Sequence, residues 1–267
     1  MDEPAERGES RFVIDDYESP CEMDGGGLLH CTDAFKNLEH FEESVGAAGD
    51  PFGEIGGSIW RCHAESMEVI ELESGFYIQP LASASMAPPS FPSVIYIDPF
   101  SAFGDGRHPS TSLCLRFLAE HADSFTADER AMLSVLDAGA GTGILSIAAE
   151  KLGAGLIDAV ELHGAAAENA RRNVRLNDCV RVTVRQGDLL AVRFGGEYDI
   201  VLANLISDVM IACLGVLTPL VRPGGVMIAS GIVKARAAEV EERIIDSGLR
   251  FRDIALLDGW MGYLLTR

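Results

Sequence analysis

The stretch that decides the fold reads Val135-Leu136-Asp137-Ala138-Gly139-Ala140-Gly141-Thr142-Gly143-Ile144. A short apolar run precedes the glycines and a helical pattern follows them, which predicts a buried strand, a tight turn and a helix. Glycine has no Cβ, so three glycines at alternate positions let the backbone approach a ligand closely. This order of strand, turn and helix is typical of nucleotide-binding α/β folds.

The spacing of the glycines discriminates between two kinds of ligand. A dinucleotide fingerprint needs a small residue at position 144, where this chain has Ile, so a pyrophosphate fits poorly. The turn instead resembles D-x-G-x-G-x-G, the first motif of S-adenosylmethionine-dependent methyltransferases. The resemblance implies cofactor contacts at Asp137, Gly139, Gly141 and Gly143. A side chain at 139 or 141 would then occupy the space of the methionine moiety and the ribose, and a turn without a ligand is the alternative reading.

Short β-branched runs alternate with amphipathic stretches after residue 94, the pattern of a parallel sheet covered on both faces. Asp258-Gly259 predicts a hairpin between two further strands. The sequence therefore predicts an α/β fold whose seven-stranded, mostly parallel, Rossmann-like sheet ends in an antiparallel hairpin. The predicted strands are Ser134–Asp137, Ile157–Glu161, Val180–Arg185, Asp199–Ala203, Val226–Ser230, Phe251–Leu257 and Trp260–Leu265, and the helices are Ile144–Leu152, Ala165–Leu176, Val209–Leu220 and Ala235–Ser247.

Residues 1–93 differ from the rest of the chain in charge. The 267 residues carry a net charge of −20, and residues 1–93 hold 19 acidic side chains against 4 basic ones. Small residues and three prolines at Ala82–Ser93 predict an extended linker. Strand-like runs at Ser58–Cys62 and Met67–Leu72, with a helical run at Thr32–Ser44, predict a small α+β domain before it. We therefore divide the chain into an acidic domain with its linker, residues 1–93, and a second domain, residues 94–267.

Composition excludes several classes of protein. A hydrophobic content of 48% excludes a largely disordered chain. No apolar run approaches the roughly 18 residues of a membrane span, and the N-terminus has no secretory signal, so we expect a soluble, cytoplasmic protein. The six cysteines include no C-x-x-C pair and the histidines no H-E-x-x-H, so no metal site is expected. The acidity disfavours direct contact with nucleic acid and favours a basic protein partner; a solubilising role is the alternative.

Polar side chains end three of the predicted strands or follow them. Glu161 lies 22 residues after Gly139, where a carboxylate can accept both ribose hydroxyls; a solvent-facing Glu is the alternative. Resemblance to the same superfamily places Asp188 near the adenine amino group, although Gly-Asp is also an ordinary turn. Asn204 ends an apolar strand. In amine methyltransferases this position often begins N-P-P-Y, whose Asn aims the nitrogen lone pair at the methyl group, whereas this chain has Asn204-Leu205-Ile206. Asn204 could instead cap the next helix, a role that Ser207 and Asp208 can also fill.

A glycine-containing loop at residues 98–111 leads into a helix whose first turn is expected to hold Pro109. The hydroxyls of Ser110 and Thr111 at such an N-terminus suit a carboxylate such as the methionine tail. Phe103 is expected either to cover the cofactor as a lid or to join the core.

Together these segments resemble the PrmA family, the methyltransferases of ribosomal protein L11, over about residues 94–267. The resemblance implies S-adenosylmethionine contacts at Thr111, Gly139, Glu161 and Asn204, and an N-terminal domain that captures the ribosomal protein. Residues 1–93 themselves show no match to that domain. The segments that carry the resemblance are Phe103–Thr111, Leu136–Ile147, Ala203–Leu205, Pro223–Gly225 and Ser230–Ile232.

The chain departs from the family pattern at four positions. Asp105 and Arg107 replace the usual threonines, Glu161 replaces the usual Asp, and His163 stands where a second acid is common. None of these changes removes a glycine, so they bear on the substrate more than on the cofactor.

The function that the resemblance implies is transfer of a methyl group to protein amino groups, with ribosomal protein L11 as the expected acceptor. Asn204 would orient the neutral amine, and either His108 or water would accept its proton; His108 could instead fix the loop. Three other functions stay open: methylation of another protein or a small amine, binding of S-adenosylmethionine without catalysis, and a dehydrogenase. The sequence does not decide the oligomeric state.

Overall fold

The computed structural model describes residues 70–71, 75–80, 94–98 and 103–267. All of them belong to one compact unit of the chain. The helix expected at Thr32–Ser44, the strand at Ser58–Cys62 and the linker at Ala82–Ser93 lie outside the described residues.

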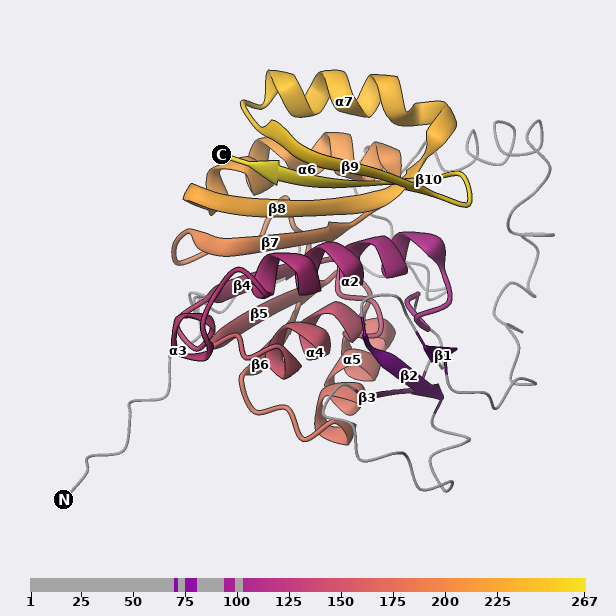
Figure 1. The fold of residues 1–267 in the computed structure, drawn as a ribbon, viewed down its shortest axis with the longest axis vertical. Helices are drawn as coiled ribbons and strands as arrows, with labels where there is room; N and C mark the ends of the chain where they lie inside the picture. The colour runs from indigo at the N-terminus through magenta and orange to yellow at the C-terminus, as the bar shows by residue number, and fades with distance from the viewer. Residues whose placement is uncertain (1–69, 72–74, 81–93, 99–102) are drawn as a thin grey trace, which may run out of the picture. The chain divides into compact units, whose positions relative to one another are not determined.

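A seven-stranded sheet forms the centre of this unit, as predicted (Figure 1). Its strand order is β6-β5-β4-β7-β8-β10-β9, and β10 alone runs in the opposite direction to the other six strands. The strands are β4 (Ser134–Ala138), β5 (Leu156–Glu161), β6 (Val182–Gln186), β7 (Tyr198–Asn204), β8 (Val221–Val233), β9 (Arg250–Leu257) and β10 (Trp260–Thr266).

The strand order creates a switch point between β4 and β7. The chain first builds outward from β4 to β5 and β6, then returns to the other side of β4 to place β7 and β8. The connections leaving β4 and β7 therefore diverge, and a crevice opens at the carboxyl ends of these two strands. Ala138 and Asn204 are their last residues, so the glycine turn and Asn204 face the same crevice.

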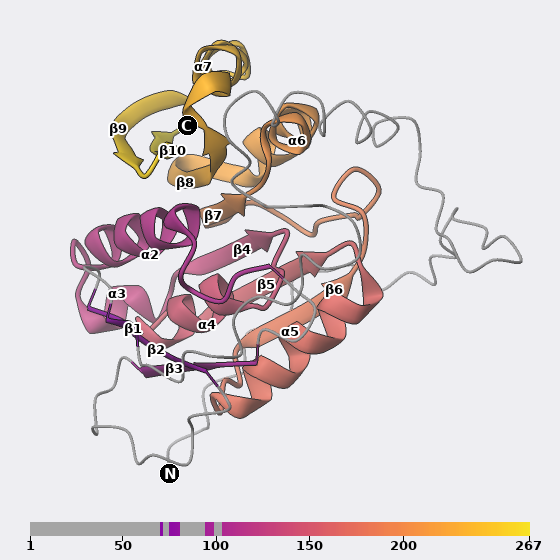
Figure 2. The same cartoon turned by 90° about the vertical axis from the view of Figure 1, so that its right-hand side faces the viewer.

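Helices cover both faces of the sheet (Figure 2). One face packs against α2, α4 and α5, and the other against α6 and α7. Each face has its own cluster of buried apolar side chains, because apolar side chains alternate to either side of the central strands β4, β7 and β8. The helices are α2 (Pro109–Ala122), the short α3 (Ala127–Arg130), α4 (Ile144–Lys151), α5 (Gly164–Leu176), α6 (Ser207–Leu220) and α7 (Ala237–Asp246).

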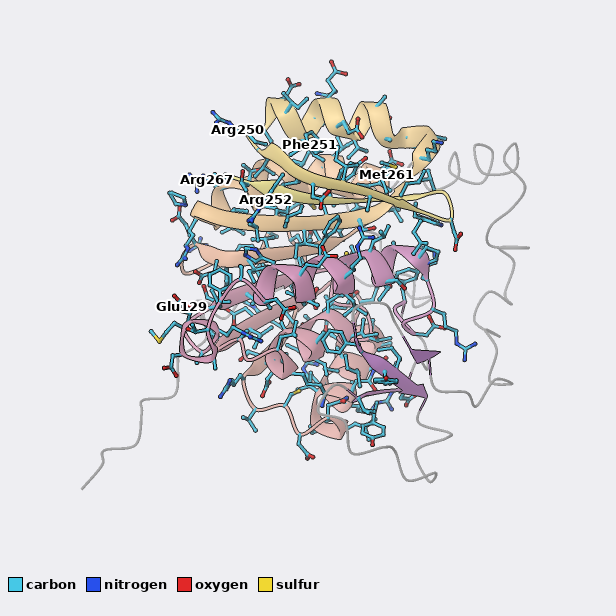
Figure 3. The ribbon with its side chains drawn as sticks, in the orientation of Figure 1. Glu129, Arg250, Phe251, Arg252, Met261 and Arg267 are labelled. Carbon is cyan, nitrogen blue, oxygen red and sulfur yellow. The ribbon has the colours of Figure 1, made fainter. Side chains whose placement is uncertain are left out.

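The predicted hairpin joins β9 to β10 through Asp258 and Gly259, both with positive φ (47° and 83°). These angles suit the two-residue turn that follows the twist of the strands. Figure 3 labels Phe251 on β9 and Met261 on β10, which both pack on the side of α6 and α7. On the opposite side a Cβ on Gly262 would lie 3.0 Å from Leu113 Cβ, so the glycine lets α2 pack closely on β10.

A second, three-stranded sheet consists of β1 (Ile70–Glu71), β2 (Tyr77–Pro80) and β3 (Val94–Ile97). Strand β1 falls within the predicted strand Met67–Leu72. Strands β2 and β3, on either side of the expected linker, pair with each other in parallel. Ile78, Ile95 and Ile97 are fully buried and join the cluster that includes α4, so this sheet shares a core with the larger one.

Several observed boundaries differ from the predicted ones by one to a few residues. Strand β6 begins two residues later, at Val182, and β8 extends back to Val221. Pro223-Gly224-Gly225 therefore lies inside β8, where Pro223 and Gly224 are exposed, Gly225 is buried and the pairing with β7 shifts register. A proline is tolerated at such an irregular, exposed position because no ladder hydrogen bond is required of it. The helix predicted from Ala235 begins as a 3₁₀ turn, Lys234–Arg236.

The amino ends of three neighbouring strands are joined through Asp199. Its carboxylate accepts hydrogen bonds from the Ser134 N–H (2.8 Å) and Oγ (2.6 Å) and pairs with Arg222. Asp199 is buried, whereas the Arg222 side chain is half exposed.

Replacing Asp199 with Ala should lower the free energy of unfolding by about 2–4 kcal/mol, because a buried N–H loses its acceptor. The loss from Arg222→Ala should stay near or below about 1 kcal/mol, because the exposed guanidinium is screened by water. Urea denaturation measures both values. Equal losses would contradict the conclusion that the hydrogen bonds of Asp199 contribute more stability than its ion pair with Arg222.

Candidate cofactor and catalytic site

Hydrogen bonds hold the glycine turn after β4 against the loop before α2. Gly139, Gly141 and Gly143 have φ values of 84°, 54° and 82°, a region that side chains disfavour. Thr142 fastens the turn to the loop before α2, donating from its N–H to Phe103 O (3.0 Å) and from its Oγ1 to Gly104 O (2.6 Å).

Neighbouring parts of the protein itself pack so closely on this turn that they require glycine there. A Cβ on Gly139 would lie 2.6 Å from Leu205 Cδ2, and a Cβ on Gly141 would collide with the Phe103 carbonyl oxygen. From the sequence, these glycines were expected because a side chain there would occupy the space of a ligand. Packing against Leu205 and Phe103 is a second reason for them, and sequence reasoning missed it because both neighbours are distant in the chain.

Glu161 ends β5 and turns its carboxylate toward the glycine turn rather than toward solvent. It is 8% exposed and accepts hydrogen bonds from Gly141 N–H at Oε2 (2.9 Å) and from His163 N–H at Oε1 (3.0 Å). Each carboxylate oxygen can accept a second hydrogen bond. Glu161 is thus fixed in orientation and can still accept two further donors such as ribose hydroxyls.

Asn204 ends β7 across the crevice from the turn. Its Nδ2 donates to Thr111 Oγ1 (3.3 Å), while its Oδ1 is buried without a hydrogen-bond partner among the described residues. Burying an amide oxygen unpaired is costly, so the position calls for a donor from a ligand. Asn204 does not cap α6, whose N-cap is Ile206. Ser207 and Asp208, which could also have filled that role, do not cap the helix either, because α6 begins without a side-chain cap.

His108 begins α2 and lies in a row of aromatic rings. Its Nδ1 accepts a hydrogen bond from Ser110 N–H (3.2 Å) and lies 2.7 Å from Ser110 Oγ. The ring packs edge-on against Phe103 (4.9 Å between centroids) and against Trp260 (4.4 Å). Burial lowers the pKa of His108, and the negative charge of Asp105 only partly offsets this effect. The imidazole is therefore neutral near pH 7, with its proton on Nε2.

The other residues proposed for the site lie near its edge. Phe103 is 42% exposed, so it is not a core residue. Asp188 is half-buried and accepts a hydrogen bond from Leu190 N–H (2.9 Å). The preceding Gly187 donates to Glu161 O (2.9 Å), which brings the turn after β6 beside the end of β5.

Asp137 lies beneath the turn, almost fully buried. Its Oδ2 accepts hydrogen bonds from the N–H (3.0 Å) and Oγ (2.5 Å) of Ser146 in α4. Burial raises the pKa of Asp137 to about 6, against the opposing effect of the Ser146 hydrogen bonds, and the nearby charge of Glu161 adds to the rise. These contacts hold the first turn of α4 against the end of β4.

A family model described as Ribosomal protein L11 methyltransferase (PrmA) matches residues 65–267. The chain belongs to this family. The ribosomal protein L11 methyltransferase of Listeria innocua is 36% identical over 237 residues, which cover 87% of this chain and 72% of that protein. That of Geobacillus thermodenitrificans is 28% identical over 269 residues, 99% of this chain and 83% of the relative.

A solved structure agrees with the family assignment. The crystal structure of ribosomal protein L11 methylase from Lactobacillus delbrueckii subsp. bulgaricus superposes with a TM-score of 0.66 at 27% identity, over 75% of this chain and 98% of that one. The resemblance to the PrmA family found in the sequence is thereby confirmed.

S-adenosylmethionine is the cofactor of the PrmA family, and the residues of this crevice fit it. Gly139 and Gly141 stay partly exposed at the switch point, so their backbone can be approached by a nucleoside. Glu161 offers two oxygens to hydroxyl groups such as those of a ribose.

Trp260 is a residue of this PrmA-family site that sequence reasoning missed. The hairpin signal predicted its strand correctly but not which neighbours its ring meets. Antiparallel return of β10 along β8 pairs Trp260 with Val233 and brings its indole to His108.

Two further observations concern metals and membranes. Within residues 70–71, 75–80, 94–98 and 103–267, no three His, Cys, Asp or Glu side chains gather in a way that could hold a metal ion. In the same part of the chain, no helix is long and apolar enough to cross a membrane.

The raised pKa of Asp137 predicts that its contribution to the free energy of unfolding depends on pH. The folded protein retains a proton here that the unfolded chain, with an ordinary pKa of 3.8, loses earlier. The stability that this group contributes is present below about pH 4 and is lost as the pH rises through about 6. Asn at this position carries no such proton.

The free energy of unfolding of Asp137→Asn, relative to the unaltered protein, should therefore rise between pH 4 and pH 7, by up to about 3 kcal/mol. Urea denaturation across this range measures the difference. A difference that does not change with pH would show that Asp137 titrates normally.

Proposed function

We propose that this chain transfers methyl groups from S-adenosylmethionine to amino groups of ribosomal protein L11. The observation that carries the proposal is the buried, unpaired Oδ1 of Asn204 at the switch point, in a chain of the PrmA family. An unpaired carbonyl oxygen here suits the N–H of an attacking amine. The acceptor is taken from the relatives, which are ribosomal protein L11 methyltransferases.

Bound S-adenosylmethionine supplies an electrophilic methyl group on a sulfonium. The protein's part is to hold the amine in line with that group, which replaces a bimolecular encounter by a positioned one. Asn204 Oδ1 accepts a hydrogen bond from the amine and so directs the nitrogen lone pair. The bond from Asn204 Nδ2 to Thr111 Oγ1 keeps the amide from rotating.

The amine must be neutral before it attacks, and a lysine amine has an ordinary pKa of about 10.4. Asn204 has no basic atom, so it orients the amine without deprotonating it. His108 has already committed Nδ1 to the first turn of α2, and its Nε2 carries the proton. We therefore assign His108 to holding the loop, and water to accepting the proton.

The acidic N-terminal region supports a basic partner. Residues 1–93 hold 19 acidic and 4 basic side chains, and opposite charge speeds association and selects orientation. We propose that residues 1–93 capture the ribosomal protein and residues 94–267 carry the transfer.

Intact-mass spectrometry of purified ribosomal protein L11, incubated with this protein and S-adenosylmethionine, tests the proposal. Mass increases in whole methyl steps are expected. Total cell protein serves as a parallel acceptor. Labelling of another protein instead would show that the methyl acceptor is an amine of that protein. Cofactor binding without labelling of any acceptor would favour a non-catalytic module.

Asn204→Ala should lower kcat about 100-fold, the scale of loss expected when a reacting group is misplaced. The Kd for S-adenosylmethionine, measured by calorimetry, should change far less, because the lost oxygen addresses the amine. Equal loss of turnover and of cofactor affinity would refute the orienting role. The melting temperatures of both proteins control for folding.

A further inference from the structure

Helix α5 presents a row of three asparagines to the smaller sheet. Asn169 and Asn173 lie within the helix and Asn177 is its C-cap, each four residues from the next. All three are buried, although asparagine is usually exposed. Buried amides need partners, and among the described residues five of the seven side-chain hydrogen bonds of this row go to the backbone of Tyr96 and Asp98.

Two of the amides pair with β3 as a neighbouring strand would. Asn177 accepts from Tyr96 N–H (2.9 Å) and donates to Tyr96 O (2.7 Å). Asn173 does the same with Asp98, at 2.9 Å and 3.0 Å. Four helical residues advance about 6 Å and two strand residues about 6.6 Å, so the two repeats match. The row therefore substitutes for a strand along this edge.

Asn173 makes one bond that Asn177 does not make. Its Nδ2 also donates to Thr142 O (2.9 Å), inside the glycine turn. Thr142 in turn holds the loop at Phe103 and Gly104. Next to Asn173, Ala170 packs against the same turn, with its Cβ 3.4 Å from where a Cβ on Gly143 would lie.

We infer that Asn173 is a positioning residue for cofactor binding, because one carboxamide holds the edge of β3 and the glycine turn together. Both hydrogens of its amide are used, one on Asp98 O and one on Thr142 O. When the amide is intact, the turn stays in the shape that a ligand meets. The inference rests on the proposed function only in taking S-adenosylmethionine as the ligand.

Asn177 provides a matched control. Asn173→Asp removes the donors to Asp98 O and Thr142 O, and Asn177→Asp removes the donors to Tyr96 O and Asn173 O. Each variant thus loses two donated bonds and keeps its acceptor oxygen. Only the first loses a bond to the glycine turn. The corresponding Ser variants serve if either Asp variant fails to fold.

The experiment measures the Kd for S-adenosylmethionine by calorimetry, without an acceptor, in the full chain. Both variants should lower Tm to a similar extent. Only Asn173→Asp should raise the Kd, by roughly fivefold to tenfold, the equivalent of one lost hydrogen bond. Amide hydrogen exchange without cofactor should be faster at Thr142 in that variant alone.

Each outcome has one meaning. If both variants raise the Kd equally, or if neither does, Asn173 has no special part in cofactor binding and the inference is wrong. If the unaltered protein does not bind S-adenosylmethionine, the proposed function fails instead, and the hydrogen exchange at Thr142 still tests whether Asn173 holds the turn.

Discussion

The backbone of the turn between Gly139 and Gly143 is the constraint on which the described site depends. Three positive φ values bring the chain from β4 into α4, and the two hydrogen bonds of Thr142 to the Phe103 loop keep it there. Glu161 is aimed through a bond to Gly141 N–H, and Leu205 packs over Gly139. The loop before α2, the end of β5 and the start of α6 are thus all placed relative to one short turn.

Few of the side chains in this crevice carry a charge. Glu161 and Asp137 lie near each other, and burial raises the pKa of Asp137 to about 6, so that Asp137 is partly protonated under mildly acidic conditions. His108 is held neutral by burial and by its role at the start of α2. Methyl transfer needs no strong acid, so a site of amides, hydroxyls and neutral rings suits the chemistry.

Local patterns were enough to predict the larger sheet. Hydrophobic periodicity located all seven strands, and Asp258-Gly259 located the hairpin, because both signals arise within a few residues of the chain. The boundaries were less accurate where tertiary pairing extends an element, as β8 does through Pro223-Gly224-Gly225. The positions of several site residues in the fold could be predicted, because Gly139, Glu161 and Asn204 each follow or end a strand that the sequence predicts.

The remaining contacts join residues far apart in sequence. Asn204 meets Thr111 across 93 positions, and Asn177 meets Tyr96 across 81. An asparagine in a helical run gives no sign that its amide will pair with a strand. The position of Trp260 beside His108 depends on the antiparallel direction of β10 and on the packing of α2, neither of which is written in the residues around it.

The position of β10 imposes an order on assembly. It follows β9 in the chain but lies between β8 and β9 in the sheet. Among the strands of the described residues, β9 pairs only with β10, so we expect its pairing to wait until the residues after the hairpin turn are synthesised. We then expect the two strands to add together, as a preformed ribbon, to the edge of β8. Hairpins form within microseconds, far faster than a chain is synthesised, so the ribbon can close before it docks.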